Sequence, residues 1–189
     1  MSGGEVLEDV NFFRQEAFKA NPDYRFCSAD TIARDLKKLA VENTGFQAVE
    51  SGKTYRFNIN DRLNELLLKA LLQLGMVSKE QPVTFDYDNQ RGSSERTFDM
   101  QNNDFGWKHL SFSFMKENTV FMILTALIRN FYVWLVGKVA AYKDFGLEAT
   151  SRVKKFVFRF VQVPFRWVFR SRQWHLQLFT SRPYDKLRL

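Results

Sequence analysis

The sequence has few of the residues that cross-link a protein through disulfides or metal ions. Cys27 is its only cysteine, and His109 and His175 are its only histidines, among 189 residues. One cysteine cannot form an internal disulfide, and two distant histidines do not have the ligand spacing of a zinc site. These absences predict a reduced protein of the cytoplasm.

Signals for export and membrane insertion are scarce as well. The first ten residues are acidic and lack the apolar core of a signal peptide. Residues 119–136 form the most apolar stretch, and their 18 residues are near the lower limit for crossing a bilayer. Arg129 lies inside this stretch, and inserting an arginine costs roughly 2.5–3.5 kcal/mol. We therefore expect a fully buried core helix, with a membrane-associated protein as the alternative.

Apolar and aromatic side chains, in contrast, are abundant. Hydrophobic residues make up 45% of the chain and aromatic residues 16%, including 20 Phe. A chain of this length and composition buries a core instead of remaining disordered. We expect one domain with a helical N-terminal appendage.

Positive charge is concentrated at the C-terminal end. Residues 151–189 carry ten Lys or Arg side chains and one acid, Asp185, for a net charge of +9. The whole chain has a net charge of +7, so residues 1–150 carry −2. A basic segment on a near-neutral body attracts polyanions, most commonly nucleic acid and next an anionic membrane. Arg152, Lys154 and Lys155 are therefore candidate DNA-binding residues, and a solvated basic face without a partner is the alternative.

Spacing of apolar residues predicts mostly helices in the first half of the chain. Helices are expected over residues 5–20 and 29–42, and a short strand over residues 55–59. Asn60 then caps a helix with a broad leucine stripe, which ends at Gly75 in the left-handed conformation.

The basic C-terminal segment predicts a helix followed by a hairpin. Residues 151–162 have basic and aromatic faces typical of a helix. Beyond Pro164, aromatic and leucine residues alternate with polar ones on both sides of a turn at residues 170–172. This alternation predicts two strands with one basic face, on which His175 is an ordinary polar residue.

Acidic residues cluster at the C-terminal end of an expected strand, residues 81–87. Asp86 and Asp88 fall on the same face of an extended chain, and two like charges there repel unless a cation or a base lies between them. Residues 92–94 offer a helix N-cap, which places Glu95 in the first turn, four residues after Arg91. Two solvated aspartates at a turn are the alternative interpretation.

The same region resembles a known family. Arg91-Gly92-Ser93-Ser94-Glu95, the run from Phe98 to Trp107, the Ser113-Phe114-Met115-x-Glu117-Asn118-Thr119 segment and residues 172–176 are similar to the C-terminal third of the DDE transposases of bacterial insertion sequences. The likeness is close over residues 91–172 and extends back to about residue 28. Members of this family cut and join DNA with an RNase H-like core.

The resemblance implies a two-metal site for phosphodiester cleavage and strand transfer. Three carboxylates would hold two Mg²⁺ ions roughly 3.5–4 Å apart. Asp88, or else Asp86, matches the first aspartate and Glu95 the glutamate, which makes Asp88 and Glu95 the expected metal ligands. Arg91 matches an arginine that contacts DNA phosphate. Asp88 and Asn102 stand where the family signature has Tyr and Lys.

The partners that the resemblance implies are transposon-end DNA and a second transposase chain. The chain would form a homodimer or a mixed dimer with an intact transposase, in the nucleoid of a bacterial cytoplasm, with no membrane association.

One part of the family's pattern is missing. Only six residues, 89–94, separate Asp88 from Glu95, too few for the strands that carry the second catalytic aspartate. We therefore expect an internally deleted transposase, catalytically defective; a non-catalytic DNA-binding remnant and an unstable product are the alternatives.

The expected fold is mixed α/β and predominantly helical. It comprises N-terminal helices over residues 1–80, an incomplete RNase H-like core with a buried apolar helix over residues 81–150, and a basic helix plus β-hairpin over residues 151–189.

Overall fold

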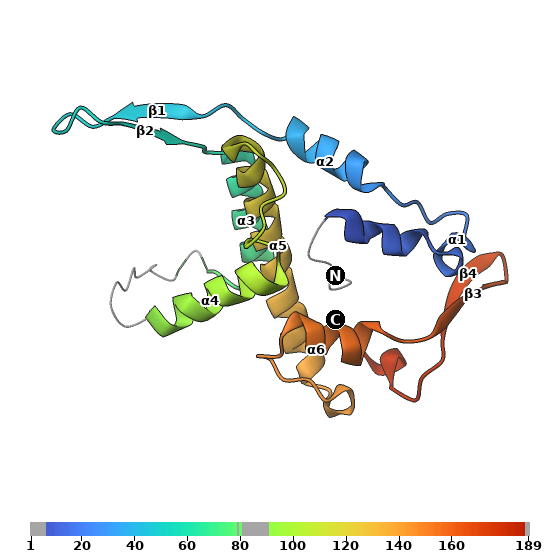
Figure 1. Cartoon of the computed structure of the whole chain (residues 1–189). Helices are drawn as coiled ribbons and strands as arrows, with labels where there is room; N and C mark the ends of the chain where they lie inside the picture. Colours follow the sequence, from blue (N-terminus) through green and yellow to red (C-terminus); the bar gives the residue numbers. More distant parts are fainter. Residues whose placement is uncertain (1–6, 79, 81–90, 188–189) are drawn as a thin grey trace. The chain divides into compact units, whose positions relative to one another are not determined.

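A computed structural model of the chain describes residues 7–78, 80 and 91–187 (Figure 1). The chain divides into two compact units. The terminal unit joins Met1–Ile32 to Val133–Leu189, and the central unit is Ala33–Tyr132. Each unit is described by itself.

The fold is mixed α/β, with about half of the chain helical and two small antiparallel sheets. This confirms the predicted fold class at that level. Across residues 7–78, 80 and 91–187, strands occur only in two separate two-stranded hairpins, one in each unit. The incomplete RNase H-like core stays a prediction, and the expected strand 81–87 lies outside the described residues.

The central unit contains the first hairpin. Its strands are β1 (Thr44–Gln47) and β2 (Thr54–Phe57), which pair antiparallel. The sequence predicted the second strand only. Helix α2 (Ala29–Lys38) precedes the hairpin and ends four residues earlier than the expected boundary at 42.

Helix α3 (Asp61–Gln73) confirms the predicted N-cap at Asn60 and the predicted helix end at Gly75. The Asn60 Oδ1 accepts a hydrogen bond from the Leu63 amide at 3.2 Å, and the Asn60 Nδ2 donates to the Leu39 carbonyl at 2.7 Å. Gly75 has a φ of 66°, a left-handed conformation that costs glycine no steric clash. One buried asparagine therefore both starts α3 and ties it to the end of the α2 segment.

Helix α4 (Arg91–Asp104) begins earlier than its sequence indicates. Residues 92–94 lie inside the helix, so they are not its N-cap, and Glu95 is not in the first turn. That prediction was wrong because helical continuation outweighed the local capping preference of serine. The helix ends before Gly106, which has a φ of 77°.

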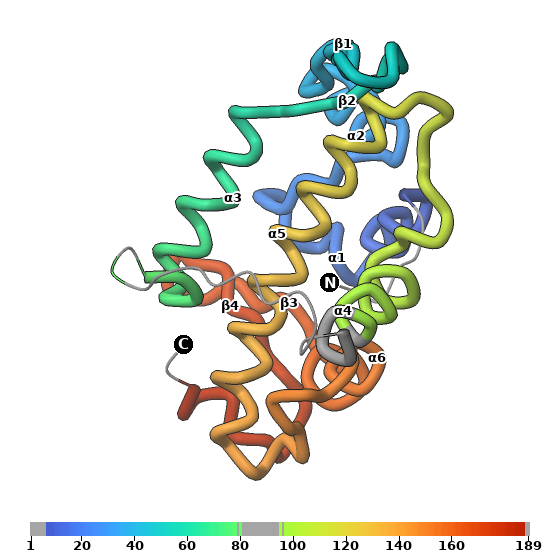
Figure 2. The backbone as a smooth tube through the Cα atoms, turned by 90° about the vertical axis from the view of Figure 1, so that its left-hand side faces the viewer, coloured from blue at the N-terminus to red at the C-terminus, as the bar shows by residue number. Residues whose placement is uncertain are grey.

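Helix α5 (Met115–Ala140) is one uninterrupted helix (Figure 2). In the described part of the chain it is the one helix long and apolar enough to cross a membrane, yet only 22% of its most apolar window is buried. Val120, Tyr132 and Val136 are fully buried, whereas Ile128 and Phe131 are each 43% exposed. The expectation of a fully buried helix was wrong, because α5 is apolar on all sides and the described residues cover only part of its circumference.

The terminal unit combines short helices with the second hairpin. The predicted helix 5–20 is a 3₁₀-helix, η1 (Leu7–Arg14), followed by the short α1 (Glu16–Lys19). The predicted helix 151–162 is α6 (Val153–Phe156), which continues into a π-helical turn, η3 (Val157–Val161). Two short 3₁₀-helices, η2 (Lys143–Phe145) and η4 (Tyr184–Lys186), complete the unit.

The core of the terminal unit is aromatic. Phe145 and Phe156 are each 1% exposed, and the Phe145 ring centre lies 5.3 Å from that of Phe160 and 5.0 Å from that of Tyr184. The Tyr184 hydroxyl donates to the Phe160 carbonyl at 2.7 Å. These contacts hold the C-terminal end of the chain against η3.

Candidate nucleic-acid interface

The second hairpin has two chemically different faces. Its strands, β3 (Phe165–Arg170) and β4 (Gln173–Leu178), confirm the predicted hairpin. Residues directly opposite each other in an antiparallel pair point to the same face. The register thus makes one face polar, which we call the basic face (Arg166, Val168, Arg170, Gln173, His175, Gln177), and the other apolar (Phe165, Trp167, Phe169, Trp174, Leu176, Leu178).

A two-residue turn closes this hairpin. Ser171 has a φ of 52° and Arg172 a φ of 64°, so both turn residues are left-handed. Positive φ at both positions is the geometry of a type I′ turn, whose twist matches that of the strands, and asparagine and glycine are favoured there. The chain adopts this turn without either residue, at some cost in backbone strain.

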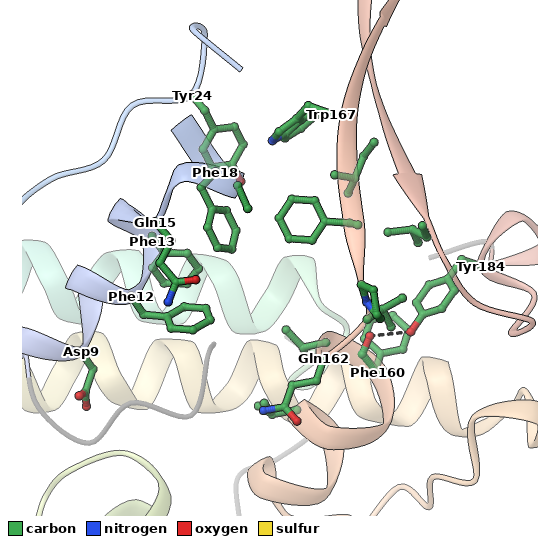
Figure 3. A pocket seen from close by; sticks show the side chains of 18 residues that line it. Asp9, Phe12, Phe13, Gln15, Phe18, Tyr24, Phe160, Gln162, Trp167 and Tyr184 are labelled. Atoms are coloured by element: carbon green, nitrogen blue, oxygen red, sulfur yellow. Dashed lines mark hydrogen bonds between the residues drawn. The ribbon is translucent and has the colours of Figure 1, made fainter. Parts of the chain in front are cut away.

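The apolar face packs on the N-terminal segment of the same unit. The Phe18 ring centre lies 5.1 Å from that of Phe165, and the Tyr24 ring centre 5.6 Å from that of Trp167. Figure 3 shows Phe12, Phe13, Phe18 and Tyr24 on one side of a cavity and Trp167 on the other. The cavity has a volume of about 1140 Å³. The apolar face lines this cavity and is partly covered, and the basic face, on the other side of the hairpin, is directed away from it.

Arginine side chains on the basic face are exposed. Arg166 and Arg170 both lie open to solvent. The Arg166 Nε donates to the Gln177 Oε1 at 2.9 Å, and its guanidinium lies 5.5 Å from the centre of the Phe179 ring. No Asp or Glu occurs between residues 149 and 184, so the hairpin itself has no acidic side chain to neutralise these cations.

Helix α6 and Arg152, the residue before it, present the three predicted DNA-binding side chains to solvent. Arg152, Lys154 and Lys155 are exposed, whereas Val153 and Phe156 are buried at 4% and 1%. The Lys155 Nζ lies 3.7 Å from the Glu148 Oε1, and both side chains are well exposed, so this ion pair neutralises the cation only weakly. The helix is therefore anchored by its apolar side and carries its cations outward.

The expected catalytic residues are described only in part. Asp86 and Asp88 lie outside the described residues, Arg91 is the first residue of α4, and Glu95 is an exposed residue of the same helix. Over residues 7–78, 80 and 91–187, no three His, Cys, Asp or Glu side chains lie close enough together to hold a metal ion. Glu95 alone is not the oxygen-rich ligand set that Mg²⁺ needs. We therefore derive no metal-dependent step from the described residues.

Arg129 is a charged residue within the apolar helix α5. Its Nη2 donates to the Thr97 Oγ1 of α4 at 3.2 Å and its Nη1 to the Asn130 Oδ1 at 3.2 Å, while its buried Nε has no hydrogen-bond partner among the described residues. Burial lowers the pKa of Arg129. The contact joins α4 to α5 within the central unit and explains how an arginine is tolerated in this stretch.

Sequence reasoning missed three exposed aromatic rings on the basic segment. Phe158, Phe169 and Phe179 are 64%, 57% and 51% exposed. Phe158 follows the buried Val157 in η3, and Phe179 follows Leu178 at the end of β4, so it continues the basic face. The strand alternation, extended by one residue, would have placed Phe179 on that face.

Comparison of the chain with models of known protein families, with curated proteins and with solved structures gives no significant match.

Proposed function

We propose that the chain is a DNA-binding protein, a non-catalytic remnant of a DDE transposase. It contacts DNA phosphates through the basic face of the β3–β4 hairpin, through Lys154 and Lys155 of α6 and through Arg152, which precedes this helix. The observation that supports the proposal best is the separation of the hairpin's two faces. N-terminal aromatic residues cover part of the apolar face, and the arginines of the basic face have no acidic neighbour on the hairpin.

Charge explains why DNA is the preferred partner. Residues 151–189 carry a net charge of +9 on a chain whose other residues sum to −2. Binding that depends on such cations releases counterions from DNA and weakens steeply as salt rises. Exposed arginines suit phosphate oxygens especially well, because the guanidinium presents its donors in a planar fork.

The salt dependence of binding to a labelled DNA duplex, followed by fluorescence anisotropy, tests the proposal. Each phosphate contact contributes about 0.9 to the slope of log K against log salt. The double variant Arg166→Ala/Arg170→Ala should lower the magnitude of that slope by roughly 2. The matched control is Lys53→Ala/Arg56→Ala, which removes two exposed cations at the other hairpin and should leave the slope unchanged. Binding that is absent or independent of salt would refute the proposal.

The catalytic part of the proposal is tested separately. The six residues between Asp88 and Glu95 leave no place for a second catalytic aspartate, so we expect no nicking of a duplex that ends in terminal inverted repeats when Mg²⁺ is supplied. Cleavage by the purified chain that disappears in Glu95→Ala would contradict this expectation and indicate an active transposase.

A further inference from the structure

Two exposed aromatic rings of the basic segment carry cations above them. The Arg159 guanidinium lies 5.8 Å from the centre of the Phe158 ring, and that of Arg166 lies 5.5 Å from the centre of the Phe179 ring. The third exposed ring, Phe169, lies on the apolar face of the hairpin, with its centre 5.1 Å from that of Trp174, and is not part of this set. Phe158 and Phe179 thus each have an arginine beside them.

Rings and cations together discriminate between forms of DNA. Cations bind the phosphates of a duplex and of a single strand alike. The flat faces of the bases, in contrast, are stacked inside a duplex and are open to aromatic side chains only in a single strand. Exposed rings interleaved with arginines are therefore complementary to unpaired bases followed along the strand by phosphates.

We propose that the segment from Phe158 to Phe179 binds single-stranded DNA in preference to duplex DNA. Unpaired bases stack on Phe158 and Phe179, and phosphates bind Arg159 and Arg166, all of which are exposed. This inference rests on the proposed DNA binding and specifies the form of DNA. Stacking of one base on one aromatic ring changes affinity by roughly five- to hundredfold.

The test compares three labelled probes of equal length on the full chain: an oligothymidylate strand, an abasic strand with the same phosphates and no bases, and a duplex. We expect the oligothymidylate to bind at least about tenfold more tightly than the abasic strand, because only it can stack. The double variant Phe158→Ala/Phe179→Ala should lose this difference and keep its affinity for the abasic strand and the duplex.

A matched control uses a phenylalanine of equal exposure outside the basic segment. Phe46 is 56% exposed in β1, and Phe46→Ala should keep the wild-type preference for oligothymidylate. Circular dichroism checks that each variant is folded. The comparison of oligothymidylate with the abasic strand needs no variant, so it decides the question even if the double variant does not fold.

The outcomes separate this inference from the proposed function. Equal affinity of the wild-type chain for the oligothymidylate and abasic strands, or tighter binding of the duplex, would overturn the single-strand inference while DNA binding itself stands. Failure to bind any of the three probes would overturn both.

Discussion

The two hairpins of this chain are alike in topology and differ in what stabilises them. Each has two antiparallel strands, and each has one apolar face. In β3–β4 that face is partly covered by Phe18 and Tyr24, whereas every residue of β1 and β2 is exposed. An isolated two-stranded hairpin is only marginally stable in water, so the covered hairpin is the better platform for a binding face.

The exposed hairpin is held by polar contacts at its open end. The Asn58 Nδ2 donates to the Val41 carbonyl at 2.7 Å and to the Asn43 Oδ1 at 2.8 Å, which joins the residues before β1 to those after β2. Its apolar side chains, Phe46, Tyr55 and Phe57, are about half exposed. Hydrogen bonds therefore stabilise the β1–β2 hairpin, whereas aromatic packing stabilises the β3–β4 hairpin.

The largest effect should come from uncovering β3–β4. Phe165→Ala removes the ring that packs on Phe18, and we expect it to lower the free energy of unfolding by about 2–3 kcal/mol. This is less than the cost of truncating a fully buried phenylalanine, because Phe165 is partly exposed. Urea unfolding followed by circular dichroism measures the loss. Phe46→Ala in β1 is the matched control and should lower the free energy of unfolding by less than about 0.5 kcal/mol. Similar losses for the two variants would refute the claim that aromatic packing stabilises only β3–β4.

A smaller effect should follow from opening the base of β1–β2. Asn58→Ala removes both side-chain hydrogen bonds, so the local stability of this hairpin should fall by about 1 kcal/mol. Hydrogen exchange of the β1 and β2 amides measures it. The β3–β4 amides are the internal control and should exchange at the wild-type rate. Faster exchange in both hairpins would contradict the idea that the Asn58 hydrogen bonds stabilise β1–β2 alone.

The smallest effects should come from the two turns, with opposite signs. Arg172→Gly relieves a left-handed arginine and should stabilise β3–β4 by about 0.5–1 kcal/mol, whereas Gly52→Ala strains a left-handed glycine in the β1–β2 connection and should destabilise it by a similar amount. Thermal unfolding of both variants measures the two shifts. A destabilising Arg172→Gly would show that the arginine side chain contributes more than its backbone strain costs.

Local patterns predicted the elements whose signals are short-range. The alternation along β3 and β4, the Asn60 cap and the left-handed Gly75 were all recognised from neighbouring residues. The start of α4, the exposure of α5 and the strand β1 were not. The exposure of α5 depends on which distant residues cover it, and the start of α4 on helical continuation through residues 92–94. Strand β1 has four exposed residues and no apolar alternation to distinguish it from a loop.

Some features of the candidate DNA-binding site could likewise be predicted from the sequence, and others could not. The charge asymmetry and the choice of Arg152, Lys154 and Lys155 came from composition, and all three side chains are exposed. The rings of Phe158 and Phe179 with arginines above them were not foreseen, since exposure of a phenylalanine depends on the fold and not on its sequence neighbours. The relation of Asp86 and Asp88 to Glu95 stays a prediction.

By itself the sequence determined the period of each strand, the caps of α3 and the concentration of positive charge after residue 150, because these depend on residues a few positions apart. Only the tertiary structure decided which face of β3–β4 is covered. The N-terminal aromatic residues are distant in sequence from the hairpin, and their contacts with Phe165 and Trp167 cover part of one of its two faces. The basic face is thereby left as the surface available to a partner.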